Sequence, residues 1–146
     1  MQIDFFVPGK PEPGGSKTAF YNRKIGRALM VDANKNVGGW KQTVKVFAMK
    51  AYAGVPFIGP LNVECTFHVQ RPAGHYGTGK NADSVKPSAP TYPVVKPDAT
   101  KLWRSTEDAL TGILWRDDAQ IVVQLICKRY GDNPGAYIIV RTLDEA

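Results

Sequence analysis

A chain of 146 residues, 43% of them hydrophobic, is long enough for one domain with its own core and need not rely on disulfides or bound metal for folding. Its 19 Lys and Arg residues outnumber 13 Asp and Glu residues, and the resulting net charge of +6 suits a polyanionic partner. No apolar run approaches the roughly 20 residues that cross a bilayer and no signal peptide is recognised, so we expect no membrane span and a cytoplasmic location.

The N-terminal part of the chain predicts a strand followed by a hairpin. Residues 3–7 are β-branched and aromatic and predict a strand that ends at a Pro-Gly pair. Residues 9–17 predict a Pro- and Gly-rich loop, which lacks the Gly, Lys, Ser/Thr order of a nucleotide-binding loop. Two short apolar runs, 20–21 and 28–31, predict a hairpin. Its turn carries basic residues that suit either a phosphate contact or solvent: Arg23, Lys24 and Arg27.

The middle of the chain predicts a helix and a strand. Residues 34–53 carry apolar side chains at spacings of three and four, which predicts a structural helix with Gly54 as its C-cap. Residues 61–70 alternate between apolar and polar and predict a half-buried strand. Glu64 and His68 lie on its polar face, where they are either solvated or at the border of an active site.

A long segment without periodicity follows this strand. Residues 71–95 are rich in Pro, Gly and Ser and contain almost no aliphatic side chains, which predicts a flexible loop. Its basic residues indicate a DNA contact, and inert disorder is the alternative: Arg71, Lys80 and Lys86.

The C-terminal part predicts a second helix and two strands. Residues 100–113 have an apolar stripe with helical spacing. Residues 120–129 and 136–143 are apolar and strand-like, and the turn signal at 131–135 predicts that they form a hairpin.

These elements predict an α+β fold, with two main helices and a mixed or mostly antiparallel sheet, in one domain over residues 1–146. The two cysteines, Cys65 and Cys127, lie far apart in apolar runs. They indicate reduced thiols in the core rather than a disulfide framework or a zinc site.

Five of the 13 acidic residues fall between positions 98 and 118 of this otherwise basic chain. Asp98 follows a proline and directly precedes the second predicted helix, so its simplest role is an N-cap, although a carboxylate there can also bind a cation. A helical wheel gathers polar side chains opposite the apolar stripe: Thr100, Arg104, Glu107, Asp108 and Thr111. Asp117 and Asp118 follow just before a strand.

These residue types suit phosphodiester hydrolysis. Mg²⁺ binds carboxylate and water oxygens, neutralises phosphate charge and lowers the pKa of a bound water. Asp98, Asp117 and Asp118 would supply the carboxylates, and Arg104 would stabilise negative charge in the transition state. In the alternative interpretation, the acids cap helices and pair with Arg104 at the surface.

The same segment resembles the RusA family of Holliday-junction resolvases, which are common in phages and prophages. The family pattern is Pro-Asp-x-Asp-Asn-x-x-Lys, then Asp-Ala-Leu, a Gly-containing turn and Asp-Asp-x-Gln before a strand. The chain contains, in this order, Pro97-Asp98, Asp108-Ala109-Leu110, Gly112 and Asp117-Asp118-Ala119-Gln120.

This resemblance implies a Mg²⁺-dependent endonuclease, with Mn²⁺ as a possible substitute, that cuts four-way junctions by paired nicks in recombination and repair. It implies a bacterial host cell, a phage or prophage origin and a homodimer, whose interface stays open among Trp40, Trp103 and the last strands. Asp98 and Asp118 match the metal-binding acids, and Arg104 stands where the family has its catalytic Lys. Further residues are expected to grip the DNA backbone together with the loop: Lys96, Lys101 and Arg116.

The chain departs from the family pattern at three positions. Thr100 replaces the second acid, Lys101 replaces Asn, and Arg104 replaces Lys, which keeps the charge but not the ability to donate a proton near neutrality. We hypothesise that Glu107 or Asp108 supplies the missing carboxylate, directly or through a metal-bound water. Direct substitution by Glu107 is disfavoured, because helical rise puts it about 10 Å from position 100.

Two alternatives from other functional classes stay open. A catalytically impaired protein that still binds junctions would result if Thr100 abolishes metal binding. A basic RNA-binding or phage structural protein would require the acidic cluster to be incidental.

Overall fold

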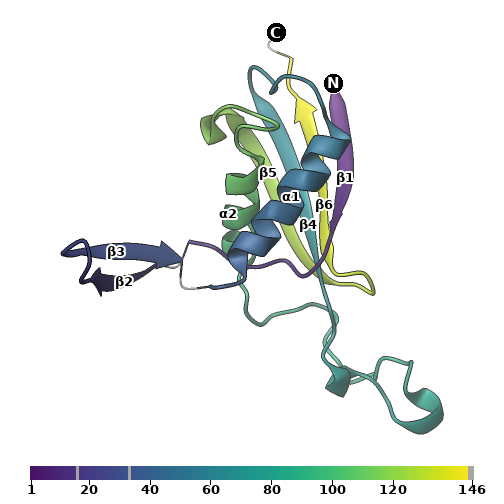
Figure 1. Ribbon diagram of the computed structural model, residues 1–146. Coiled ribbons are helices and arrows are strands. Elements are labelled where there is room, and N and C mark those ends of the chain that lie inside the picture. The colour runs from purple at the N-terminus through teal and green to yellow at the C-terminus, as the bar shows by residue number, and fades with distance from the viewer. Residues whose placement is uncertain (16, 33, 145–146) are drawn as a thin grey trace.

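Four strands form one sheet, and both helices cover the same face of it (Figure 1). This computed structural model describes residues 1–15, 17–32 and 34–144. The chain runs in the order β1 (Gln2–Pro8), β2 (Lys17–Asn22), β3 (Arg27–Asp32), α1 (Val37–Ala51), β4 (Leu61–Val69), α2 (Ala99–Leu110), β5 (Ile121–Tyr130) and β6 (Gly135–Thr142). Short 3-10 turns add η1 (Ala73–His75), η2 (Gly79–Asn81) and η3 (Asp118–Gln120).

The sheet has the strand order β1-β6-β4-β5. Strand β6 runs antiparallel to β1 and to β4, whereas β4 and β5 are parallel. The predicted α+β fold with a mixed, mostly antiparallel sheet is therefore confirmed.

The predicted hairpin between residues 120–129 and 136–143 is wrong, because β4 lies between β5 and β6. The turn itself is present, and it passes over the end of β4, where the Gly131 amide donates to the Val69 carbonyl at 3.1 Å. A turn motif predicts that the chain reverses its direction. It does not predict whether the strands before and after the turn pair with each other or with a third strand between them.

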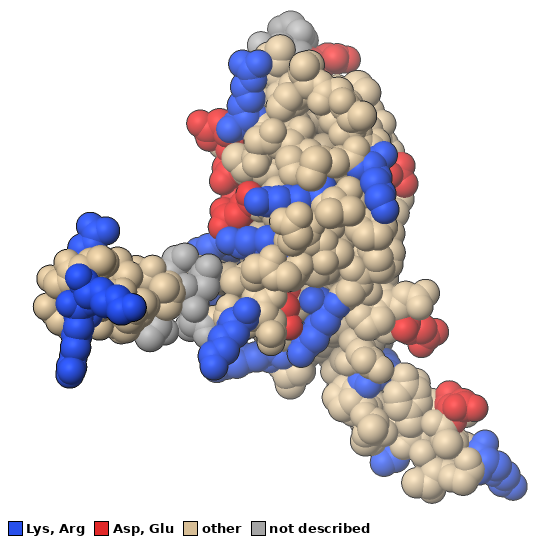
Figure 2. Space-filling model, in the orientation of Figure 1, with Lys and Arg blue, Asp and Glu red and all other residues tan. Residues whose placement is uncertain are grey.

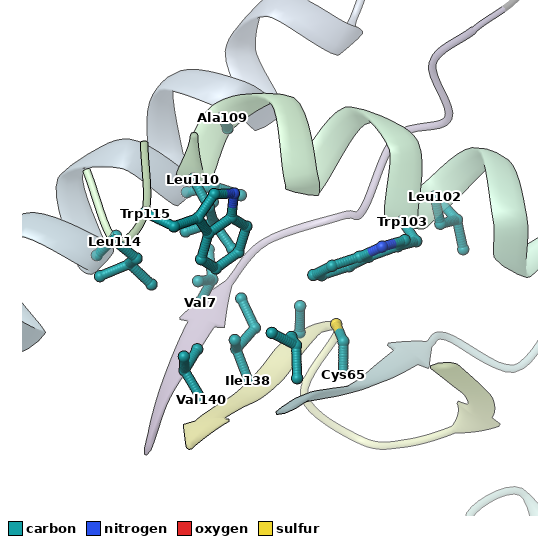
Figure 3. Close-up of a cluster of buried hydrophobic side chains, with 14 of the residues drawn as sticks. Val7, Cys65, Leu102, Trp103, Ala109, Leu110, Leu114, Trp115, Ile138 and Val140 are labelled. Carbon is teal, nitrogen blue, oxygen red and sulfur yellow. The ribbon is translucent and has the colours of Figure 1, made fainter. Parts of the chain in front are cut away.

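The core lies between the helices and the sheet. The alternation of β4 puts Leu61, Val63, Cys65 and Phe67 on the covered face, each 0–1% exposed. Figure 3 shows α2 side chains such as Trp103 and Leu110 above Ile138 and Val140 of β6. Burial of each large apolar side chain contributes about 1.5–3 kcal/mol to stability. The core therefore fixes α2, and the polar edge of α2, against the sheet.

Both helices end differently from the prediction. Helix α1 ends at Ala51, and the extended Tyr52 takes the C-cap position that was predicted for Gly54. The Tyr52 hydroxyl donates to the Val55 carbonyl at 2.6 Å, which holds the chain after the helix. Helix α2 ends at Leu110 instead of residue 113, because Thr111 is extended and Gly112 has a φ of +90°.

Two segments project from this body (Figure 1). One is the β2–β3 hairpin, called the arm below, which confirms the predicted hairpin and forms a two-stranded sheet of its own. The other is the segment 71–97, in which the Gly77 amide donates to the Ser84 carbonyl and the Lys86 amide to the His75 carbonyl. These bonds give the segment local structure, while its flexibility stays a prediction.

The expectation of two unpaired cysteines has a structural counterpart. Cys65 and Cys127 are both free thiols, although Cys65 alone is fully buried and Cys127 is half-buried. Within the described ranges, no helix has the length and apolar character needed to cross a membrane.

Candidate active site

The turn that precedes β5 is fastened to the body by the side chain of Gln120. Its Oε1 accepts from the Arg116 and Asp117 amides at 2.9 and 3.1 Å. Its Nε2 donates to the Phe57 and Gly59 carbonyls at 2.9 and 3.1 Å. The Gln of the Asp-Asp-x-Gln motif thus holds the two aspartates in a fixed turn.

The two aspartates of this turn have different environments. The Asp117 carboxylate accepts from the Ala119 amide at 2.8 Å and caps η3. The Asp118 carboxylate instead accepts from the Thr111 hydroxyl and from the Trp115 indole nitrogen, the latter at 3.1 Å. Trp115 is fully buried, so these donors orient Asp118 towards the end of α2.

Glu107 of α2 meets Asp118 at this point. Partial burial of the Glu107 carboxyl, followed by the negative charge of Asp118 and a hydrogen bond between the two groups, raises the pKa of Glu107 from 4.5 to about 7. The Trp103 indole has the opposite effect, because its hydrogen bond favours the charged form. Two carboxyl groups in contact repel each other when both are ionised, and a bound cation would relieve this repulsion.

Asp98 lies at the other end of α2. It occupies the N-cap position, as predicted, but its side chain makes no capping hydrogen bond and is exposed. Helical rise separates positions 98 and 107 by about 13 Å along the axis. No group of three or more His, Cys, Asp or Glu side chains is arranged to hold a metal ion in the described part of the chain.

Glu107 and Asp108, the two candidates to replace the missing acid, lie on different sides of α2. Asp108 is 54% exposed and pairs with Lys41 of α1, with 3.6 Å between Nζ and Oδ2. The structure therefore brings Glu107, and not Asp108, to Asp118. Thr100 is the second residue of α2 and is exposed.

Arg104 lies under the N-terminal Pro- and Gly-rich loop. The Gly14 amide donates to the Lys101 carbonyl at 3.0 Å, and the Ser105 hydroxyl donates to the Glu12 carbonyl at 2.6 Å. A Cβ atom at Gly15 would lie 2.5 Å from both Cδ and Nη1 of Arg104. Sequence reasoning missed this contact, and the Gly14-Gly15 pair was its one local signal.

Most of the predicted DNA-binding residues are exposed, and Figure 2 shows Lys and Arg side chains on the arm, the lower body and the projecting segment. The exception is half-buried Arg71, which donates to the Pro90 carbonyl at 2.7 Å and lies 4.3 Å above the Tyr130 ring. The others are Lys80, Lys86, Lys96, Lys101 and Arg116.

Glu64 and His68 lie on the uncovered face of the sheet, opposite α2. Glu64 accepts from Arg141 at 2.7 Å, and His68 packs edge-on against Phe6. They belong to the surface of the sheet and do not border the Glu107–Asp118 pair.

The class of protein is an endodeoxyribonuclease, because the chain matches the family described as endodeoxyribonuclease RusA over residues 8–141. The chain thus belongs to the RusA family, whose members act on Holliday junctions. It is also 24% identical over 139 residues to the uncharacterized protein YqaN of Bacillus subtilis (strain 168), with 95% of each chain covered. The resemblance of one short segment therefore extends to nearly the whole chain.

Proposed function

We propose that this protein is a Mg²⁺-dependent endonuclease that resolves four-way junctions by paired nicks, in recombination and repair. The contact between Glu107 and Asp118 carries the proposal, because it places two carboxylates side by side in a member of a DNA-cutting family. Neither acid has a cationic partner among the described ion pairs.

Glu107 and Asp118 would hold the metal ion. Mg²⁺ keeps several waters and usually takes one or two protein carboxylates together with phosphate oxygens, so this pair fits it, and Mn²⁺ accepts the same oxygen donors. When bound, the ion neutralises phosphate charge and lowers the pKa of a coordinated water. The family pattern assigns Asp98 to the metal site. In this conformation, its distance along α2 does not let it share an ion with Glu107 and Asp118.

Residues around the pair would bind and orient the DNA. Arg104, whose side chain passes close to Gly15, presents a permanent positive charge for the additional negative charge of the transition state. Lys96, Lys101 and Arg116 are exposed and would contact the phosphate backbone without reading its sequence.

Paired nicks need two sites related by a two-fold axis, so we propose a homodimer. Trp40 and Trp103 are each 4% exposed, which leaves the last strands as the source of the interface. Strand β5 forms an edge of the four-stranded sheet, and Val122 and Leu125 on it are 60% and 55% exposed. Pairing through this edge would cover both side chains.

A labelled synthetic four-way junction tests the function. With Mg²⁺ or Mn²⁺, wild-type protein is expected to make symmetric nicks, and Asp118→Asn is expected to bind the junction without nicking it. Asp108→Asn is the matched control, because it removes a carboxylate of α2 that pairs with Lys41 and does not meet Asp118. Undiminished nicking by Asp118→Asn would contradict the proposed site.

A second candidate is a junction-binding protein with impaired catalysis. Two observations favour it: Thr100 carries no charge, and Asp98 lies far along α2 from the carboxylate pair. It predicts junction binding in EDTA and no nicks with either metal.

A further inference from the structure

A cavity of about 960 Å³ lies at the end of the sheet from which the segment 71–97 leaves the body. The final residues of three strands line it, among them Pro8 of β1, Val69 of β4 and Tyr130 of β5. The segment closes the other side through Pro93 and Val95. Its volume lies within the range of about 300–1,000 Å³ that is typical of small-molecule sites.

The charged side chains that line this cavity are all basic. Its lining includes four basic residues and no Asp or Glu: Lys10, Arg71, Lys96 and Lys128. The rest of the lining is largely apolar, with prolines, valines and Phe6. An occupant with a flat apolar part and a negative charge fits this lining, and a nucleotide has both.

Two of the basic residues hold the cavity in shape. Lys128 Nζ donates to the carbonyls of Val95 and Pro97 at 2.7 and 3.0 Å. Arg71 stacks on Tyr130 and donates to the Pro90 carbonyl, so it fixes the same segment. Their bonds tie the cavity wall to the residues that lead directly into Asp98.

The other two basic residues are exposed. Lys10 has an 84% exposed side chain with a 3.9 Å contact to Glu12, and Lys96 is exposed two positions before Asp98. A phosphate at this opening would therefore meet two exposed cations.

We propose that this cavity receives an unstacked nucleotide of the DNA strand that passes Asp98. The inference rests on the proposed function, since it requires the protein to bind junctions. Base stacking is interrupted where strands exchange in a four-way junction, so moving a base out of the helix costs less there than in a duplex. The base would lie among the prolines and valines, and its phosphate would contact Lys10 and Lys96.

Fluorescence of 2-aminopurine, placed at successive positions around the crossover, tests this in EDTA, where no cutting occurs. Unstacking raises the fluorescence of this base, so wild-type protein is expected to produce a several-fold rise at one position. Ala73→Trp places a large side chain at an exposed position of the cavity lining and is expected to abolish the rise. Ala82→Trp, at an exposed position of the same segment that does not line the cavity, is the matched control and is expected to retain it.

Two further measurements separate a lost nucleotide site from damaged protein. A junction with an abasic nucleotide at the responding position is expected to restore wild-type affinity to Ala73→Trp, because no base then needs the filled space. Lys10→Glu reverses an exposed charge and is expected to weaken the rise without unfolding the protein.

Intact junction binding with no fluorescence rise at any position would overturn the cavity proposal and leave the proposed function standing. A rise that Ala73→Trp and Lys10→Glu leave unchanged would also overturn it. Failure to bind junctions at all would overturn both.

Discussion

The carboxyl groups of Glu107 and Asp118 are in contact, although one belongs to helix α2 and the other to the turn that starts η3. The Thr111 hydroxyl and the Trp115 indole orient Asp118, whereas Glu107 is held by its position on the helix. Partial burial of Glu107, followed by the charge and hydrogen bond of Asp118, raises its pKa to about 7, so without a cation this pair retains a proton near neutrality. Under the proposed function, Glu107 and Asp118 would together supply the carboxylates, while the family position at Thr100 carries no acid.

The metal-free protein is expected to lose stability as pH rises through the range in which Glu107 ionises. The pKa of Glu107 is about 7 in the folded protein, against 4.5 for an ordinary Glu, so the folded state holds its proton more tightly than the unfolded state does. The stabilisation is complete below about 4.5 and is lost as pH passes about 7. Thermal unfolding in EDTA should show this loss for wild type and not for Glu107→Gln. Asp108→Asn serves as the control, and a difference between wild type and Glu107→Gln that does not change with pH would refute the prediction.

Thr111 is expected to act as a positioning residue for the metal. Thr111→Val keeps the shape of the side chain but removes the hydroxyl that donates to Asp118, and loss of such a supporting contact lowers metal affinity by about 10–100-fold. Titration with Mn²⁺ measures this directly. Thr111→Ser retains the hydroxyl and should restore the affinity, whereas a purely structural role for Thr111 would leave metal binding unchanged in both variants.

Gly15 is expected to control the position of Arg104. A Cβ at Gly15 would overlap the Arg104 guanidinium, and displacement of a catalytic group by about 1 Å lowers the rate by about 100-fold. Gly15→Ala should therefore cut junctions far more slowly while binding them nearly as well. Gly79→Ala is a matched control, because Gly79 also has a positive φ, +59° against +86°, but nothing within 4 Å of the added Cβ. Equal cutting rates for the two variants would show that Gly15 does not position Arg104.

The arm is expected to contact DNA phosphates. It carries Arg23, Lys24 and Arg27 around a turn that stands away from the body, and a two-stranded ribbon has little core of its own. Each lost phosphate contact lowers the slope of log affinity against log salt by about 0.9. Junction binding by Arg23→Ala over a range of salt concentrations should show this change. Lys50→Ala, which removes one charge from α1, should leave the slope unaltered, and a wild-type slope for Arg23→Ala would indicate a solvated turn.

Local patterns in the sequence predicted the positions of the helices and strands well. They did not predict which strands are neighbours in the sheet. The cap position of Asp98 and the alternation of β4 follow from residue type and spacing, and the structure confirms both. The neighbours of β5 and β6 depend on which strand enters between them, which a turn signal does not encode.

The candidate site could be predicted in its composition and not in its contacts. The acids of the 98–118 segment were visible from the sequence, but the meeting of Glu107 with Asp118 depends on how the chain reverses at Gly112. Gly15 and Arg104 lie close together although they are far apart in the sequence, and no periodic pattern in the sequence predicts such a contact.

The first strand of the sheet has its pairing partner in the last one, since β1 lies at the edge and bonds to β6. During synthesis on the ribosome, residues 2–8 must therefore wait unpaired until residues 135–142 have emerged. Strand β6 then inserts between β1 and β4 and completes the sheet. This late step brings together strands that are far apart in the sequence, so it closes a long loop. The nascent chain consequently acquires a complete sheet, and with it the platform for α2, only after residues 135–142 have been made.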